Sequence, residues 1–312
     1  MPTSKSPAAR KTPSSPATIQ PLKGVRVLSL ALNLPGPAAL MRCRQMGANC
    51  VKLEPPPPTG APAGASGDPM KLYNLTAYAA LHEGVRTATA DLKTERGQKL
   101  LHRELAKTDV LLTSFRPSAL VKLGLTWKAL HKQHPQLSQV AIVGSLGERA
   151  EEPGHDLTYL AENDLVTGLD LPATLYADMG GSLMASEAVL QAVLHQRTKS
   201  KGVYLEVALS AAAGYLALPR SWGLTQPGAA VGGGHAGYRL YACKDGRVAM
   251  AALEPHFAAS LCAAAGVQAA GMKAMFAPAT HAAIETWLKG KTRKELDALA
   301  AEKDIPLHTL AR

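Results

Sequence analysis

Short apolar runs alternate with segments of helical periodicity through the first half of the chain. The β-prone runs cover 25–30, 50–53, 86–90, 109–113 and 139–143, and the helical segments cover 38–46, 72–81, 94–106 and the stretches that end near Gly124 and begin at Trp127. Strand, turn, helix and strand in this repeated order predict βαβ units and therefore a doubly wound parallel sheet. Such sheets bind ligands at the carboxyl ends of their strands. The first turn lacks the GxGxxG pattern, so a dinucleotide site is not indicated.

The second half of the chain changes to a mixed pattern. A core-facing helix is predicted at 182–197 and a strand at 204–209. A hairpin over 238–252, turning at Lys244-Asp245-Gly246, then begins a smaller α+β domain with helices at 257–265, 281–288 and 294–302. The predicted organisation is a tail at 1–20, a large α/β domain at 21–225 and a smaller domain at 226–312. The glycine run before His235 is predicted to be a flexible loop, and it is a weak match to a phosphate cradle because no Lys-Ser/Thr pair follows.

The composition of the chain limits the classes of partner that it is expected to bind. The chain has 312 residues and a net charge of +10, which favours an anionic partner such as nucleic acid or a phosphorylated cofactor. Aromatic residues are only 4% and no zinc-finger or RNP-like pattern occurs, so nucleic acid is disfavoured. No apolar run is long enough for a bilayer, and we expect no membrane partner. The four cysteines have no CxxC spacing, which is typical of reduced thiols in a cytoplasmic protein, and no metal site is expected.

The first 20 residues, MPTSKSPAARKTPSSPATIQ, differ from the rest of the chain. They are rich in Pro, Ser, Thr and basic residues and have almost nothing to bury. This composition predicts a disordered basic tail.

The candidate chemistry lies between Pro153 and Met184. His155 and Asp156 follow a Pro-Gly turn, and Asp178 precedes a pair of glycines, so each group stands at the mouth of a predicted helix. An imidazole and a carboxylate presented in this way are candidates for a general acid/base pair. The simpler alternatives are that both aspartates are helix N-caps and that His155 is an ordinary surface histidine.

The motifs, taken in order, carry a resemblance. PLKGVRVLSL, GPAALMRCRQMGANCVKLEPP, TADLKTERGQKLL, DVLLTSFRPSALVKLGL, PGHDLTY, ADMGGSLM and YACKDGRVAMAALEPHF together resemble the family III CoA-transferases, a superfamily that includes alpha-methylacyl-CoA racemase. The resemblance spans roughly residues 21–312. It implies a Rossmann-like large domain that binds coenzyme A, a smaller α+β domain, and an interlocked homodimer. The acyl-CoA is then the substrate, and no tightly bound cofactor is expected.

Within that superfamily the GHD and LEPxF motifs are more similar to the racemase branch. The resemblance implies that His155 and Asp178 are the two α-proton acid/base groups and that Glu254 lies nearby, in a 2-methylacyl-CoA racemase or epimerase. In the transferase branch the residue matching Asp178 is the nucleophile that becomes an aspartyl-CoA thioester, so a CoA-transferase is the alternative. The third hypothesis is a non-catalytic protein that binds acyl-CoA or serves as a partner protein.

Coenzyme A phosphates require cationic groups. The residues expected to supply them are Arg42, Arg44, Lys52, Arg86, Arg116 and Lys122, with Arg116 favoured. The chain departs from the family at Pro55 and Lys122, where arginines are usual, at the loop 144–149 and near Ala211. It also ends at Arg312, before the segment that returns to the large domain in relatives, so the resemblance is to a short, divergent and C-terminally truncated member.

Overall fold

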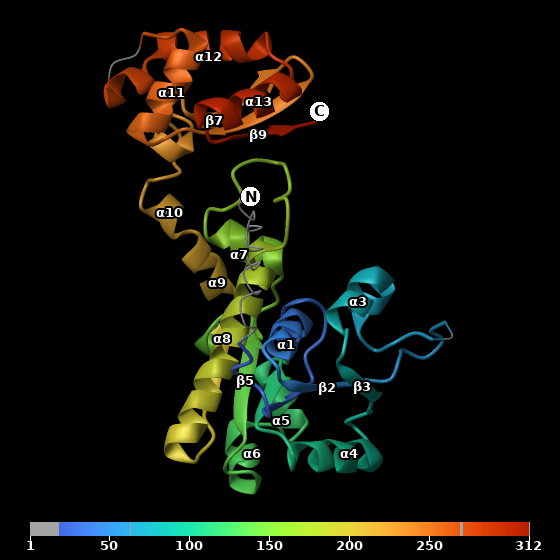
Figure 1. Cartoon of the computed structure of the whole chain (residues 1–312). Coiled ribbons are helices and arrows are strands. Elements are labelled where there is room, and N and C mark those ends of the chain that lie inside the picture. The colour runs from blue at the N-terminus through green and yellow to red at the C-terminus, as the bar shows by residue number, and fades with distance from the viewer. Residues whose placement is uncertain (1–18, 63, 269–270, 312) are drawn as a thin grey trace, which may run out of the picture. The chain divides into compact units, whose positions relative to one another are not determined.

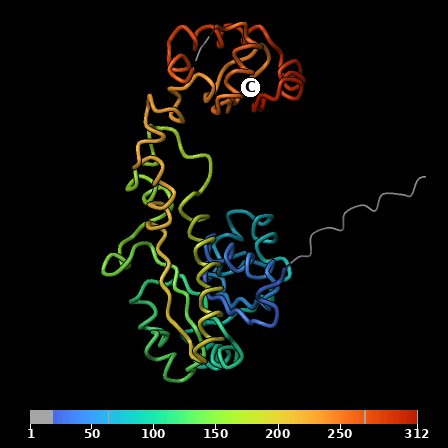
Figure 2. Tube along the Cα trace, turned by 60° about the vertical axis from the view of Figure 1, so that its left-hand side comes forward, coloured from blue at the N-terminus to red at the C-terminus, as the bar shows by residue number. Residues whose placement is uncertain are grey.

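The computed structural model describes residues 19–62, 64–268 and 271–311. The chain forms two compact units divided between Tyr215 and Leu216 (Figures 1 and 2). We expected a domain boundary after residue 225. The predicted tail at 1–20 lies outside the described residues except for Ile19 and Gln20.

A parallel sheet of six strands organises the first unit, in the order β3-β2-β1-β4-β5-β6. The strands are β1 (Arg26–Ser29), β2 (Asn49–Glu54), β3 (Arg86–Thr89), β4 (Val110–Thr113), β5 (Ser138–Val143) and β6 (Tyr204–Ala208). Leu28 of β1 is in register with Val51 of β2 on one side and with Leu111 of β4 on the other. This confirms the doubly wound α/β fold that the alternating pattern predicted.

Helices cover both faces of this sheet. The helical segments of the unit are α1 (Pro35–Gln45), α2 (Pro69–Tyr73), α3 (Leu75–Leu81), α4 (Glu95–Leu105), α5 (Pro117–Lys122), α6 (Trp127–Gln133), the 3-10 turn η1 (Gly147–Glu151), α7 (Asp156–Glu162), α8 (Tyr176–Lys199) and α9 (Leu209–Leu216). Successive strand residues point to opposite faces. Val110 therefore joins the core under α1 and α8, which lie side by side in Figure 1, whereas Leu111 joins the core under α4, α5 and α6.

Two helices begin earlier than the sequence predicted. Helix α1 begins at Pro35, inside the predicted turn, because proline suits the first position of a helix, where its missing N–H costs nothing. Helix α8 begins at Tyr176 and contains the glycine pair that lies outside the helix predicted at 182–197. Gly181 is buried there against Leu209, and a Cβ at this position would come within 2.3 Å of the Leu209 Cδ2.

The second unit is α+β, as predicted, and has its own apolar core. Its elements are α10 (Leu218–Ser221), η2 (Ala230–Gly232), β7 (Tyr238–Cys243), β8 (Gly246–Ala251), α11 (Pro255–Ala265), η3 (Met272–Phe276), α12 (Pro278–Lys289), α13 (Arg293–Lys303) and β9 (Leu307–Leu310). The three strands form an antiparallel sheet in the order β7-β8-β9, and the sequence did not predict β9. Val248, Leu261 and Ile284 are fully buried between this sheet and the helices.

Two further properties of the described part of the chain concern membrane-spanning helices and disulfides. None of its helices combines the length and the apolar character that crossing a membrane requires. Its four cysteines are free and buried.

Candidate functional site

A cavity of about 380 Å³ opens at the carboxyl edge of the parallel sheet. Its walls come from the segments that follow four strands: Asn33 after β1, Ser114 after β4, Gly144 after β5 and Leu209 after β6. The strand order reverses direction between β1 and β4. The cavity therefore occupies the topological switch point, where open α/β sheets bind their ligands.

His155 and Asp178 both line this cavity. His155 immediately precedes α7, and a local turn fixes its backbone, because its N–H donates to Thr158 Oγ1 (3.0 Å) and Thr158 Oγ1 donates to its carbonyl oxygen (2.7 Å). The His155 side chain is exposed. Asp178 is a residue of the first turn of α8, so two helix starts distant in the sequence bring the predicted pair to one cavity.

Asp156 connects the two helix starts. The residue is only 5% exposed, and its Oδ1 accepts a hydrogen bond from the backbone N–H of Asp178 (3.0 Å). Asp156 thus binds the first turn of the neighbouring helix, and Asp178 is not an N-cap, since Leu175 occupies that position. The backbone N–H of Asp178 is consequently engaged within the protein.

The acidity of Asp178 is shifted. Burial, followed by the nearby charge of Asp156, raises the pKa of its carboxyl group to about 6, and the charge of His155 acts in the opposite direction. A carboxyl group that titrates near neutral pH is suited to both accepting and donating a proton. The site therefore contains a carboxyl group poised for acid/base chemistry next to an imidazole.

Tyr159 contributes a further polar group that the sequence indicated only as part of a motif. Its side chain lines the cavity, and its hydroxyl is held between two glycines, because a Cβ at Gly144 or Gly154 would come within 2.3 or 2.5 Å of it. Burial and the charge of Asp178 raise the pKa of Tyr159. The phenol thus stays protonated at neutral pH and can donate a hydrogen bond.

Among the predicted cations, Arg116 lines the cavity, at the start of α5 directly after β4. Arg42 is exposed on α1 and Lys122 is exposed at the end of α5. Arg44 donates to the carbonyl of Gly84 (3.2 Å). Arg86 begins β3, at the amino edge of the sheet, and pairs with Glu104 (2.7 Å).

Lys52 has a different location from the one we expected. It is fully buried in β2, where its ammonium group pairs with Asp68 and with Glu54 (3.1 Å) and donates to Nε2 of His82 (2.8 Å). A phosphate cannot reach a cation that has no exposed surface. The prediction that Lys52 binds coenzyme A phosphates is therefore inconsistent with its position in the fold.

The buried Lys52 ammonium group holds part of the cavity wall in place. The Asp68 carboxylate that pairs with it accepts hydrogen bonds at Oδ1 from the backbone N–H of Asn33 (3.1 Å) and of Met70 (3.0 Å). Asn33 and Met70 both line the cavity, and Asn33 has the left-handed φ of 64° that is uncommon outside glycine. The ion pair thus joins the loop after β1 to the start of α2.

Glu54, Asp68 and His82 also resemble a metal-ligand set, because one ligand atom of each lies within 4.8 Å of the others. The ammonium group of Lys52 stands among them. Burial raises the pKa of Glu54, but hydrogen bonds from Ser66 and Tyr78 and the charge of Lys52 bring it below its ordinary value. Burial, followed by the charge of Lys52, lowers the pKa of His82. The cluster is accordingly an internal ion pair with a neutral imidazole.

Glu254, the third predicted catalytic residue, belongs to the second unit. It is the exposed residue that immediately precedes α11, and its side chain makes no capping hydrogen bond. Its part in catalysis stays a prediction.

Replacing Lys52 by methionine is expected to lower the free energy of unfolding by about 3–5 kcal/mol, because it leaves two buried carboxylates without their cation. The matched control is Lys99→Met, which removes an exposed pair with Glu95 and should change the stability by less than about 1 kcal/mol. Urea denaturation of both variants measures the difference. Equal stabilities of the two variants would contradict the structural role of Lys52.

Asp178→Asn is expected to stabilise the fold above pH 6, because the folded protein otherwise holds a carboxylate whose pKa has been raised to about 6. As the pH falls through 6 towards the ordinary value of 3.8, the wild-type carboxyl group becomes neutral and the advantage should disappear. Chemical denaturation across this range is the measurement, with the exposed Asp170→Asn as control. A gain that does not depend on pH would exclude this explanation.

Comparison with known proteins gives the family. A model of CoA-transferase family III matches residues 22–312. The succinyl-CoA–D-citramalate CoA-transferase of Chloroflexus aurantiacus is 33% identical over 202 residues, which are 60% of this chain and 48% of that protein. The alpha-methylacyl-CoA racemase of Homo sapiens is 27% identical over 254 residues, which are 76% of this chain and 62% of that protein.

A solved structure agrees with the fold described above. The crystal structure of a CAIB/BAIF family protein from Brucella suis superimposes with a TM-score of 0.74 at 23% identity, over 94% of this chain and 85% of that chain. The present chain spans about half the length of several curated relatives that it matches. With the family model matching from Leu22 onwards and the same fold in a solved relative, the chain belongs to CoA-transferase family III.

Proposed function

We propose that the chain is an enzyme of CoA thioesters, and that it inverts the α-carbon of a 2-methylacyl-CoA with His155 and Asp178 as the two acid/base groups. The observation that carries the proposal is that both side chains line one cavity at the switch point of the sheet, with the pKa of Asp178 raised to about 6. The similarity to a protein named alpha-methylacyl-CoA racemase supports the same reaction.

The chemistry requires a proton to leave one face of the α-carbon and another to arrive on the opposite face. In one direction the carboxylate of Asp178 accepts the α-proton and the imidazolium of His155 returns one, and the roles exchange for the other enantiomer. The enolate oxygen that forms in between must be stabilised by hydrogen-bond donors. The protonated phenol of Tyr159, which lines the same cavity, is suited to this task.

Arg116 supplies positive charge for a coenzyme A phosphate in this proposal. Its guanidinium group lies at the cavity and its planar fork matches a phosphate group. Arg42, Arg86 and Lys122 do not line the cavity, and we assign them no part in it. We expect the homodimer and the participation of Glu254 from the family resemblance alone.

A CoA-transferase reaction is the second candidate, because several relatives are CoA-transferases by name. In this reaction the Asp178 carboxylate attacks the thioester carbonyl and expels the CoA thiolate, which leaves an acyl-aspartyl anhydride. The thiolate then attacks the aspartyl carbonyl, which releases the carboxylic acid and forms an aspartyl-CoA thioester. The carboxylate of the acceptor acid then attacks the aspartyl-CoA thioester and expels the CoA thiolate, and the thiolate attacks the acyl carbonyl of the new anhydride. These steps release the acceptor's acyl-CoA and free Asp178.

Deuterium wash-in at the α-carbon tests the first proposal. In deuterated buffer, the wild-type protein is expected to label a 2-methylacyl-CoA, and His155→Gln or Asp178→Asn should slow labelling about 10²–10⁴-fold. Labelling that depends on the Asp178 carboxylate should also slow as the pH falls below about 6. Mass spectrometry of the recovered thioester is the measurement, and Asp170→Asn is the control that should leave the rate unchanged.

The same incubations separate the alternatives. A hydroxylamine-sensitive CoA adduct on Asp178 without α-labelling would replace the racemase by the transferase. Acyl-CoA binding without label or adduct, over a panel of acyl groups, would indicate the non-catalytic binder and overturn both enzymatic proposals.

A further inference from the structure

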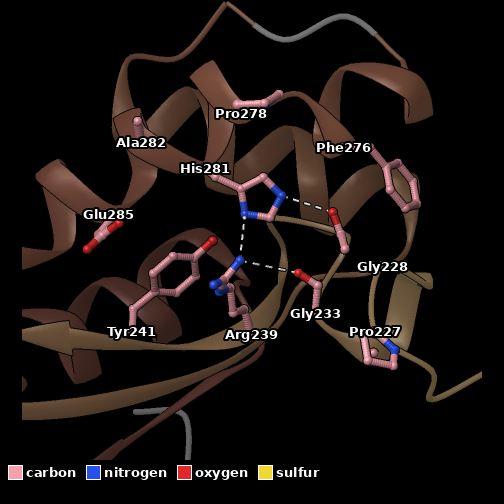
Figure 3. Close-up of a pocket in the computed structure, with 12 residues that line it drawn as sticks. Pro227, Gly228, Gly233, Arg239, Tyr241, Phe276, Pro278, His281, Ala282 and Glu285 are labelled. Carbon is pink, nitrogen blue, oxygen red and sulfur yellow. Dashed lines mark hydrogen bonds between the residues drawn. The ribbon is translucent and has the colours of Figure 1, made fainter.

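A second cavity, of about 820 Å³, lies entirely within the second unit (Figure 3). One wall is the glycine loop of Gly232, Gly233 and Gly234, and Arg239 of β7 and His281 of α12 face it. None of these residues lines the cavity at the switch point of the parallel sheet.

The glycine loop is a packed structure, which corrects the sequence expectation of a flexible loop. The N–H groups of Gly232 and Gly234 both donate to the carbonyl of Ala229, at 3.0 and 2.9 Å. A Cβ at Gly232 would come within 1.9 Å of the Gln226 carbonyl oxygen, one at Gly234 within 2.1 Å of the Gly228 oxygen, and Gly233 has a φ of +89°. Each position thus requires glycine for backbone packing or conformation, and the wall is preorganised.

The guanidinium group of the exposed Arg239 contacts the loop and His281 through one nitrogen. Nη1 lies 3.4 Å from the Gly233 carbonyl oxygen and 3.4 Å from His281 Nδ1 (Figure 3). His281 Nε2 donates to the Gly234 carbonyl oxygen (2.9 Å), because a carbonyl can only accept, so Nδ1 of the neutral ring is the acceptor for Arg239. These contacts use one corner of the guanidinium group, and its Nε and Nη2 edge has no hydrogen-bond acceptor among the described residues.

Arg239 forms no ion pair within the described part of the chain, although its charge, after that of Lys289, helps to lower the pKa of Glu285. Glu285 also lines the cavity, but its carboxylate pairs with Lys289 (2.7 Å) on the next turn of α12. The cavity therefore keeps the positive charge of Arg239. An exposed arginine that touches the cavity wall through Nη1 and keeps an unused two-donor edge is suited to a group with two negatively charged oxygens.

We propose that this cavity binds a small organic oxyanion, a carboxylate or a phosphate, through the Nε and Nη2 edge of Arg239. Its volume is large for an inorganic ion and falls in the range of small-molecule pockets. Phe276, Pro227 and Pro278 supply apolar surface for the body of the ligand. The inference goes beyond the proposed racemase reaction, since it concerns a different cavity and does not depend on acyl-CoA turnover.

Protection from phenylglyoxal, an arginine-specific reagent, tests the site on the full-length wild-type protein without acyl-CoA. Millimolar inorganic phosphate or succinate is expected to slow modification of Arg239 about tenfold, the equivalent of one good charge-assisted pair. Arg247, exposed on the adjacent strand β8 and not in the lining, is the internal control and should react at an unchanged rate. Peptide mass spectrometry gives both rates, and the phosphate and succinate arms distinguish the two kinds of oxyanion.

Binding measurements on variants provide the second test. Arg239→Gln should weaken calorimetric binding of the protecting anion about tenfold, whereas Arg247→Gln should leave it unchanged. Arg239→Lys keeps the charge but not the fork, and its affinity should lie between these two. Equal protection of both arginines, or no protection of either, would overturn the proposal, whether or not the protein exchanges α-protons.

Discussion

The buried ion pair between Lys52 and Asp68 is the constraint on which the first unit depends. An ammonium group without exposed surface, inside a parallel strand, must find its counter-charges within the protein. They come from Glu54 at the end of the same strand and from Asp68 beyond the proline-rich loop. The ion pair with Lys52 holds Asp68 at the end of the proline-rich loop. Asp68 in turn accepts hydrogen bonds from the turn after β1 and from the first residues of α2. The shape of the cavity therefore follows from a charge that no ligand touches.

The adjacent residues His155 and Asp156 have different roles in the site. His155 and Asp156 are neighbours in the sequence, yet the first lines the cavity and the second points into the protein to hold the backbone of Asp178. The inward carboxylate therefore does two things for its partner: it anchors the helix turn, and its charge helps to keep the partner's pKa high. Position and acidity of the proposed base are thus set by one side chain.

Hydrophobic periodicity predicted the strands of the large sheet and the small hairpin well, because their burial pattern is local. The sequence could not show that Lys52 is buried, because an isolated lysine in a strand looks the same whether its counter-charges are distant or absent. The glycines of α8 also lay outside the predicted helix, and the loop at 232–234 was predicted to be flexible, for a related reason. Gly181 packs against Leu209, and Gly232 and Gly234 pack against the backbone at 226–229, and these neighbours come together only in the fold. Of the residues that meet at the cavity, His155 and Asp178 were predicted from their places at helix starts and from the motif resemblance, and Arg116 from its charge. Tyr159 was not predicted as a site residue and stood only within a motif.

The separate apolar cores of the two units have a consequence for thermodynamic measurements. The core around Val248 and Leu261 shares no residue with the cores that pack against the parallel sheet. Cooperative unfolding is a property of a single packed core, and chains with more than one commonly depart from two-state behaviour. A melting temperature of the whole chain would then average two transitions, and calorimetry would have to resolve them before any substitution is assigned an energetic cost.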